Sequence, residues 1–570
     1  MNLQAVFNIA EICARHGVRQ VVLSPGSRCA PLTLAFARHP HLQVRTITDE
    51  RAAAFIGLGI ALATQRPVVL VCTSGTAVLN YAPAVAEAFY QQVPLLVITA
   101  DRPPEWIDQL DGQTIRQEQI YGRHVKRSFS FPVDAQHPDA YWYSQRIVSE
   151  ALLETQTYPP GPVHLNVPLR EPFYPKPGEK ITFAPDIKVI QELSNDNGLT
   201  SSQLNLLKHI ITTPQTTFKK ILVVAGQNHP DVELEEAIQA FAKATGAVIM
   251  ADVISNLHQV PEVIRLQDVH LAGKNTRKGE QLQPDLLITF GLSNISKNLK
   301  MFLRAFPPQA HWHVQPAGPV ADPFRSLTQI IRTQPVHYFS SLAQIQSNPR
   351  NKRYQNLWQE REKDAQVFLT DFLNQDNFNE FTAYARVLES LPLPCNLHLA
   401  NSMSVRYANI IGLGADKPVQ VFANRGTSGI DGSTSTAVGV ALSTEVLNVL
   451  ITGDLAFFYD RNGLWHNYLP ANFKIVLLNN HAGGIFRIID GPRQQPELEA
   501  FFETHQSLNA VQTAKDFNMA YFACRSNAEL QQILPAFYKN GAAILEIFTS
   551  STENAAFFGA FKKYNPFGNK

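Results

Sequence analysis

Short apolar runs alternate with longer stretches of helical spacing along the whole chain. Runs rich in β-branched residues, for example 20–23, 68–71 and 95–98, are bounded by Pro, Gly, Ser or other polar residues and predict strands. The uninterrupted apolar run 52–63 is longer and predicts a buried helix. Strands that alternate with helices pair in parallel through crossover connections. The pattern therefore predicts an α/β fold in which mainly parallel sheets are flanked by helices.

This alternation is interrupted twice. After a strand expected at 163–167 comes a Pro-rich stretch that ends in the polar residues 194–198, which is typical of a linker. A second alternating set fades into the polar residues 344–353. The strands expected beyond the linker cover 221–224, 285–290, 419–422, 446–451, 474–478 and 543–548. We expect three domains, at 1–185, 186–345 and 346–570, and the first and third look alike in architecture.

Composition agrees with several folded domains and excludes some functions. A chain of 570 residues exceeds one ordinary core, and 45 % hydrophobic against 17 % charged residues is a balance that folds. The 49 Lys and Arg nearly cancel the 48 Asp and Glu, so no basic field favours nucleic acid. No apolar run reaches the roughly 20 residues of a membrane span. The N-terminus lacks the features of a signal peptide, so we expect a cytoplasmic protein.

Polar residues follow two strands of the third domain. Gly453 and Asp454 come directly after the strand expected at 446–451, and Asn480 follows the strand expected at 474–478. Ligands bind beyond the carboxyl ends of parallel strands, and these oxygen atoms suit Mg²⁺. Gly453 permits close approach of a diphosphate, and a carbonyl near Ala482 would complete the metal ligands. Gly453-Asp454 alone, or Asn479-Asn480 alone, fits an ordinary turn or helix cap. The two pairs at this spacing together predict a diphosphate and metal site.

The spaced pair resembles the diphosphate and metal motif of thiamine-diphosphate enzymes. That resemblance implies a carboxylate that hydrogen-bonds the aminopyrimidine of the cofactor, and Glu50, just before the apolar run, matches it. Taken alone, Asp49 and Glu50 would be a helix cap and a partner of the helix dipole. Ile430 matches the large aliphatic residue on which the cofactor bends, and Ser402 falls in a matching motif beside the cofactor.

Five further segments narrow the resemblance to one family. They are 24–28, 73–77, 99–104, 111–115 and 424–432. From Ser24 to Phe486 the chain resembles the 2-succinyl-5-enolpyruvyl-6-hydroxy-3-cyclohexene-1-carboxylate synthases of menaquinone biosynthesis. The resemblance implies a transferase that uses thiamine diphosphate with Mg²⁺ or Mn²⁺, decarboxylates 2-oxoglutarate and adds the succinyl unit to isochorismate. It also implies a homodimer or homotetramer, with each site shared between the first domain of one subunit and the third domain of its neighbour.

The two implied substrates are dicarboxylates, so their site needs cations. The matching motifs give as substrate-binding residues Ser27, Arg28, Arg102, Gln113, Lys297, Asn401, Ser402, Arg406 and Arg425. Gln113 is also expected to contact the reacting carboxylate and joins Glu50 as a catalytic residue. The expected cofactor-binding residues are Glu50, Ser402, Ile430, Gly453, Asp454 and Asn480, and the expected metal ligands are Asp454, Asn480 and Ala482.

Two other functions share part of this pattern. Another thiamine-dependent 2-oxoacid decarboxylase or an acetolactate-type synthase would keep Glu50 and the metal motif, but a pyruvate enzyme would need fewer cations. An acetolactate-type enzyme often holds a flavin at its middle domain, and residues 225–228 lack a dinucleotide fingerprint. A thiamine-fold protein that only binds would release no carbon dioxide from any 2-oxoacid. The set of arginines favours the synthase.

Overall fold

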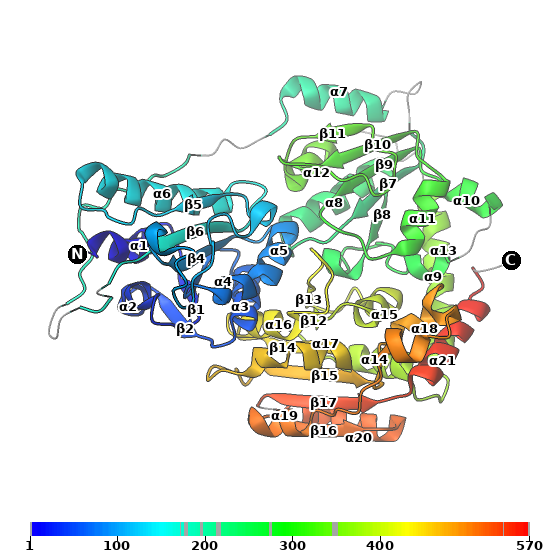
Figure 1. The fold of residues 1–570 in the computed structure, drawn as a ribbon. Coiled ribbons are helices and arrows are strands. Elements are labelled where there is room, and N and C mark those ends of the chain that lie inside the picture. The colour runs from blue at the N-terminus through cyan, green and yellow to red at the C-terminus, as the bar shows by residue number, and fades with distance from the viewer. Residues whose placement is uncertain are drawn as a thin grey trace.

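Three parallel sheets, one in each third of the chain, organise the structure (Figure 1). It is a computed structural model that describes residues 3–171, 173–175, 180–193, 198–212, 218–272, 276–344, 352–539 and 541–567. Within these ranges, no helix combines the length and the apolar character that crossing a membrane requires. The expected cytoplasmic location stays a prediction.

The first sheet has the strand order β2-β1-β3-β4-β6-β5. Its strands are β1 (Gln20–Leu23), β2 (Gln43–Thr46), β3 (Val68–Cys72), β4 (Leu95–Asp101), β5 (Ser128–Ser130) and β6 (Val163–Pro168). The helices around it are α1 (Gln4–Arg15), α2 (Ala30–Ala37), α3 (Glu50–Thr64), α4 (Thr76–Asn80), α5 (Ala82–Gln91) and α6 (Pro138–Gln156), with short 3-10 turns η1 (Pro104–Trp106) and η2 (Gly122–His124). Alternate residues of β3 and β4 enter two different cores, one on each face, so β3 is apolar throughout and β4 is apolar over 95–98.

The middle sheet has the order β11-β10-β9-β7-β8. Its strands are β7 (Ile221–Ala225), β8 (Val248–Ala251), β9 (Leu286–Phe290), β10 (Ala310–Val314) and β11 (Gln329–Ile331). The helices of this region are α7 (Ser201–Thr212), α8 (Val232–Thr245), η3 (Val253–Ser255), α9 (Gln267–His270), α10 (Thr276–Leu282), α11 (Lys297–Ala305) and α12 (Pro335–Ala343).

The third sheet has the order β13-β12-β14-β15-β17-β16. Its strands are β12 (Cys395–Leu399), β13 (Val419–Phe422), β14 (Leu447–Gly453), β15 (Phe473–Asn479), β16 (Ala520–Cys524) and β17 (Ala543–Phe548). Its helices are α13 (Lys352–Leu373), α14 (Glu380–Glu389), α15 (Met403–Ile411), α16 (Ser433–Ala441), α17 (Asp454–Tyr459), η4 (Arg461–Leu464), α18 (Ile485–Ile488), η5 (Pro492–Gln494), η6 (Leu498–Glu503), α19 (Val511–Asp516), α20 (Asn527–Phe537) and α21 (Ser551–Tyr564). Counted from its first strand, this order equals that of the first sheet, which confirms the expected likeness.

Every strand expected from the sequence is present, and several others were missed. The missed strands are β2, β5, β8, β10, β11, β12 and β16. Most are short or carry polar side chains; in β12 the polar residues Asn396 and His398 are buried. The polar residues 194–197 and 345–351, on which the domain boundaries depend, lie outside the described residues. We keep the boundaries at 185 and 345 as a proposal.

Helices α3 and α16 join the first and third sheets, and they lie side by side at the centre of Figure 1. A Cβ at Gly59 would lie 2.1 Å from the carbonyl oxygen of Thr436, and a Cβ at Gly439 would lie 2.1 Å from that of Ile56. The two backbones therefore touch at a pair of glycines. The hydrophobic core around this crossing contains residues of both domains, so the first and third domains share one core.

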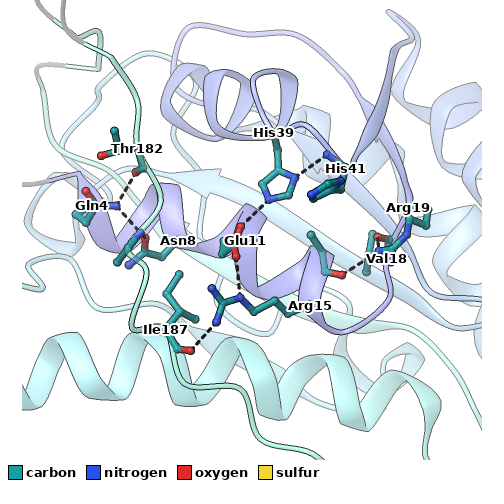
Figure 2. A network of polar contacts seen from close by, with 12 residues as sticks. Gln4, Asn8, Glu11, Arg15, Val18, Arg19, His39, His41, Thr182 and Ile187 are labelled. Atoms are coloured by element: carbon teal, nitrogen blue, oxygen red, sulfur yellow. Dashed lines mark hydrogen bonds and ion pairs between the residues drawn. The ribbon is translucent and has the colours of Figure 1, made fainter.

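The segment that leaves the first sheet is held against α1 (Figure 2). Gln4 donates to the carbonyl of Thr182 (2.7 Å), and Arg15 donates to the carbonyl of Ile187 (2.9 Å). Glu11 orders Arg15 through a 2.7 Å ion pair and contacts His39 at 2.8 Å. Up to Ile187, the described part of the linker is therefore fixed to the first domain.

Candidate functional site

Residues expected to bind metal meet at the carboxyl ends of β14 and β15. These strands are neighbours, and Gly453 pairs with Leu478 in register. Asp454 is the first residue of α17, and Asn480 directly follows β15. Asp454 Oδ2 and Asn480 Oδ1 both accept the N–H of Ala482, at 3.1 Å and 3.0 Å. The three residues expected as metal ligands are thus brought together.

The electrostatics of this cluster fit a divalent cation. Asp454 is buried, which raises its pKa to about 6. Behind it, the buried Glu380 accepts a hydrogen bond from Asn480 Nδ2 (3.1 Å); burial, and then the charge of Asp454, raise the pKa of Glu380 to about 7. No Lys or Arg of the described residues is bonded to either carboxylate. Two buried carboxylates beside amide and carbonyl oxygens form a set of donors that suits Mg²⁺.

The donors are unlike a transition-metal site. In the described part of the chain, no group of three or more His, Cys, Asp and Glu is arranged to hold a metal. A metal here would rely on one carboxylate, one amide and one backbone carbonyl. Among the backbone hydrogen bonds of the described residues, the Ala482 carbonyl accepts only the N–H of Gly484 (2.9 Å), so it can also bind a metal. Oxygen donors of this kind favour Mg²⁺ or Mn²⁺ over zinc.

The surroundings of the metal cluster leave room for a cofactor. A Cβ on Gly453 would meet no atom within 4 Å, so space adjoins the end of β14. Ile430 is 41 % exposed, so its aliphatic side chain is accessible to a ligand. Ser402 precedes α15 with a positive φ of 67°, a conformation that non-glycine residues adopt mainly under local constraint. That Gly453, Ile430 and Ser402 lie beside the cofactor stays a proposal.

Two arginines of the third domain lie close to each other. Arg425 Nη1 donates to Asn401 Oδ1 (2.7 Å), and Arg406 Nη1 donates to the carbonyl of Ser402 (2.5 Å). Burial, and then the charge of Arg406, lower the pKa of Arg425. The Nε of Arg425 is buried and has no hydrogen-bond partner among the described residues. An anion at this point would relieve the repulsion between the two guanidinium groups.

The middle domain brings one lysine, Lys300, close to Arg425. Lys297, expected to contact substrate, is the exposed first residue of α11. Lys300, one turn further along, was missed from the sequence; burial lowers its pKa, and the charge of Arg425 adds to that effect. Asn298 donates to the carbonyl of Asp268 (3.0 Å). The i to i+3 spacing of the two lysines was the signal that could have identified Lys300.

In the first domain, Glu50 is the first residue of α3. Asp49 is the N-cap of this helix and accepts the N–H of Ala52 (3.1 Å). Asp49 also accepts a hydrogen bond from Asn462 (2.8 Å). The Glu50 carboxylate has no hydrogen bond among the described residues, so Asp49, and not Glu50, caps α3.

A second pair of arginines lies in the first domain. Arg28 Nη1 donates to the carbonyl of Leu169 (3.0 Å), and Arg102 forms a 2.6 Å ion pair with Asp111. Burial, and then the charge of Arg102, lower the pKa of Arg28. Ser27, next to Arg28 in the chain, is exposed.

Gln113 is held by backbone packing. It has a φ of 53°, and a Cβ on Gly75 would lie 3.2 Å from its backbone. Its side chain is exposed. The buried Gln117 braces the same loop, because its Oε1 accepts the N–H of Gly75 (2.9 Å). No hydrogen bond or ion pair of the described residues joins the expected site residues of the first domain to those of the third.

Comparisons with known proteins agree with this geometry. Residues 4–120 match the family "Thiamine pyrophosphate enzyme, N-terminal TPP binding domain", 196–399 match "Middle domain of thiamine pyrophosphate", and 403–547 match "Thiamine pyrophosphate enzyme, C-terminal TPP binding domain". The chain is 48 % identical to the 2-succinyl-5-enolpyruvyl-6-hydroxy-3-cyclohexene-1-carboxylate synthase of Cytophaga hutchinsonii, over 98 % of this chain and 99 % of that protein. The chain belongs to this synthase family.

Other members of the synthase family extend the same result. The synthase of Flavobacterium johnsoniae is 38 % identical over 96 % of both chains. That of Porphyromonas gingivalis is 36 % identical over 96 % of this chain and 95 % of its own. Membership of the synthase family confirms the expected α/β fold, the cofactor thiamine diphosphate and a transferase of menaquinone biosynthesis. The roles of individual residues stay proposals.

Proposed function

We propose that this synthase decarboxylates 2-oxoglutarate and adds the resulting succinyl unit to isochorismate. The observation that carries the proposal is the presence of two arginine pairs, Arg28 with Arg102 and Arg406 with Arg425. In each pair, burial and the charge of the neighbouring arginine lower the pKa of one guanidinium group, Arg28 or Arg425. Dicarboxylates would relieve the repulsion in both pairs. A pyruvate enzyme has less need of such a set.

The residues present fit the cofactor and a metal. Asp454, Asn480 and the Ala482 carbonyl would hold Mg²⁺ or Mn²⁺, and Gly453 would adjoin the diphosphate. Once bound, thiamine diphosphate supplies the nucleophilic carbon and the electron sink for decarboxylation. The Glu50 carboxylate would hydrogen-bond the aminopyrimidine ring and hold a proton there. Ile430 would support the ring system through its exposed aliphatic side chain.

The remaining residues would hold the two dianions. Arginine forks grip carboxylates through two parallel hydrogen bonds, which fixes orientation as well as position. Gln113 would donate to the reacting carboxylate, and Lys297 would supply a charge from the middle domain. The Asn401 amide group donates to the carbonyls of Asn424 (2.8 Å) and Gly429 (2.7 Å), and its oxygen accepts from Arg425. We therefore propose that Asn401 contributes mainly by holding Arg425.

The direct test is carbon dioxide release from 2-oxoglutarate, measured with thiamine diphosphate and Mg²⁺ in the presence and absence of isochorismate. We expect release that is coupled to loss of isochorismate. Pyruvate is the control substrate. A preference for pyruvate would overturn the proposed substrates, and a lack of release from both would favour a protein that only binds its cofactor.

We also propose that the active site lies between two subunits. The first-domain cluster around Glu50 and the third-domain cluster around Asp454 would then face each other across a homodimer or homotetramer interface, as the family resemblance implies. Each subunit would supply half of two sites.

Co-expression of E50Q and D454N chains tests this arrangement. In a mixed dimer, one shared site carries both substitutions and the other carries neither. Random pairing should restore roughly a quarter of wild-type activity, because half of the dimers are mixed and each has one intact site. The controls are the two single variants expressed alone. No recovery in verified mixed dimers would place both clusters in one subunit.

A further inference from the structure

Glu87 is a buried carboxylate of the first domain that contacts a loop of the third. It lies on α5 and is 1 % exposed. Its Oε1 accepts the N–H of Gly426 (2.7 Å), and its Oε2 accepts the N–H and the hydroxyl of Thr427 (both 2.6 Å). All three donors belong to the loop between β13 and α16, the segment that carries Arg425 and Ile430. Glu87 was not among the site residues expected from the sequence.

The loop and α5 approach each other at the level of the backbone. A Cβ on Gly426 would lie 2.6 Å from the carbonyl oxygen of Glu87 and 3.0 Å from the amide nitrogen of Gln91. A side chain at this position would push the loop away from the helix. The contact of Glu87 therefore depends on glycine directly after Arg425.

Residues of the other two domains hold the same loop. The Gln227 amide donates to the carbonyl of Ala423 (2.9 Å), and the Ser293 hydroxyl donates to the carbonyl of Arg425 (3.3 Å). From the third domain, Asn401 donates to the carbonyls of the loop and accepts from the Arg425 guanidinium. Of the four residues Glu87, Gln227, Ser293 and Asn401, Glu87 is the one that accepts backbone N–H groups of the loop, and it is the one with an acidic side chain.

We propose that Glu87 is a positioning residue that fixes Arg425 for binding a substrate carboxylate. The inference rests on the proposed function, in which Arg425 binds a dicarboxylate. A buried carboxylate with three short hydrogen bonds cannot move without leaving its charge unpaired, so it holds the backbone at 426 and 427 in one place. Because Arg425 directly precedes Gly426, fixing the backbone there also fixes the point from which the Arg425 side chain extends.

The isosteric variant E87Q separates positioning from a general contribution to stability. The glutamine oxygen can still accept one hydrogen bond, but its NH₂ group would face donors. Loss of a charge-assisted hydrogen bond corresponds to about a tenfold effect. We expect the KM of one dicarboxylate substrate to rise about tenfold while kcat changes less than about twofold, because Arg425 binds the ground state and the transition state alike.

A readout that does not depend on catalysis accompanies the kinetics. Backbone amide exchange of the loop 424–432 should become about tenfold faster in E87Q at whichever of Gly426 and Thr427 loses its acceptor oxygen. In an R425A background, E87Q should change the KM by less than about twofold, because the residue that Glu87 positions is then absent. The milder T427V variant removes only the hydroxyl contact and keeps the test available should E87Q not fold.

N565A is the matched control. Asn565 is buried and donates to the carbonyl of Val269 (2.8 Å), a contact between the third and middle domains far from the loop in sequence. N565A should lower stability without changing either KM. Faster loop exchange together with the selective rise in KM would support the proposal. Unchanged loop exchange, an unchanged KM, or a KM effect that persists in R425A would overturn it. If wild-type enzyme does not act on 2-oxoglutarate, the proposed function fails while loop exchange still reports on Glu87.

Discussion

An E50Q variant is expected to lose about 10²–10⁴-fold in carbon dioxide release while it keeps its fold and its affinity for thiamine diphosphate. The amide has the shape of the carboxylate but cannot accept and hold a proton in the same way. Asp49 caps α3, so the helix does not depend on the Glu50 charge. Release from 2-oxoglutarate, circular dichroism and calorimetric titration of the cofactor measure the three quantities.

D49N is the control for this experiment. Asparagine is as good an N-cap as aspartate, so the helix should form and activity should stay within a few-fold of wild type. Normal turnover by E50Q would remove Glu50 from the mechanism. Loss of cofactor binding together with turnover would instead make Glu50 a structural residue.

A D454N variant should lose metal-dependent cofactor binding. The substitution removes the carboxylate from the expected metal ligands, and we expect an affinity for Mg²⁺ lower by about 100-fold or more. Because burial disfavours the Asp454 charge, the metal-free variant should unfold at a temperature no lower than metal-free wild type. Titration of Mg²⁺ in the presence of thiamine diphosphate, with thermal unfolding of the metal-free proteins, tests both expectations.

D490N serves as the comparison, since Asp490 is an exposed carboxylate of the same domain, 83 % exposed at its side chain. It should bind Mg²⁺ as wild type does. Unchanged Mg²⁺ affinity in D454N would exclude Asp454 as a ligand. A large drop in the unfolding temperature of metal-free D454N would show that the carboxylate holds the fold together instead.

The fold could be predicted well where the sheets are buried on both faces. The whole of β3 and the first four residues of β4 are then continuous apolar runs, which stand out in the sequence. The polar residues of β12 hid that strand, because Asn396 and His398 are satisfied by Asn448 of the neighbouring strand at 3.1 Å and 3.0 Å. Such pairing across strands cannot be seen in one segment of sequence.

Some residues of the candidate site could likewise be predicted from the sequence, and others could not. Asp454 and Asn480 could be identified because each follows a recognisable strand, and both signals are local. Gln506, which donates to Asp454 Oδ2 (3.1 Å), carries no such signal. Glu87 is a helix residue whose partner lies 339 positions away in the chain. Its importance depends on how two domains dock, which neither segment reveals by itself.

Chimaeras that exchange domains between related synthases have to respect the crossing of α3 and α16. A methyl group at Gly59 or Gly439 would lie 2.1 Å from a carbonyl oxygen of the opposite helix. A first domain from one relative can therefore be combined with a third domain from another only if both parents keep glycine at this crossing. For recombination, the two domains are therefore coupled at this crossing, although the whole middle sheet separates them in the sequence.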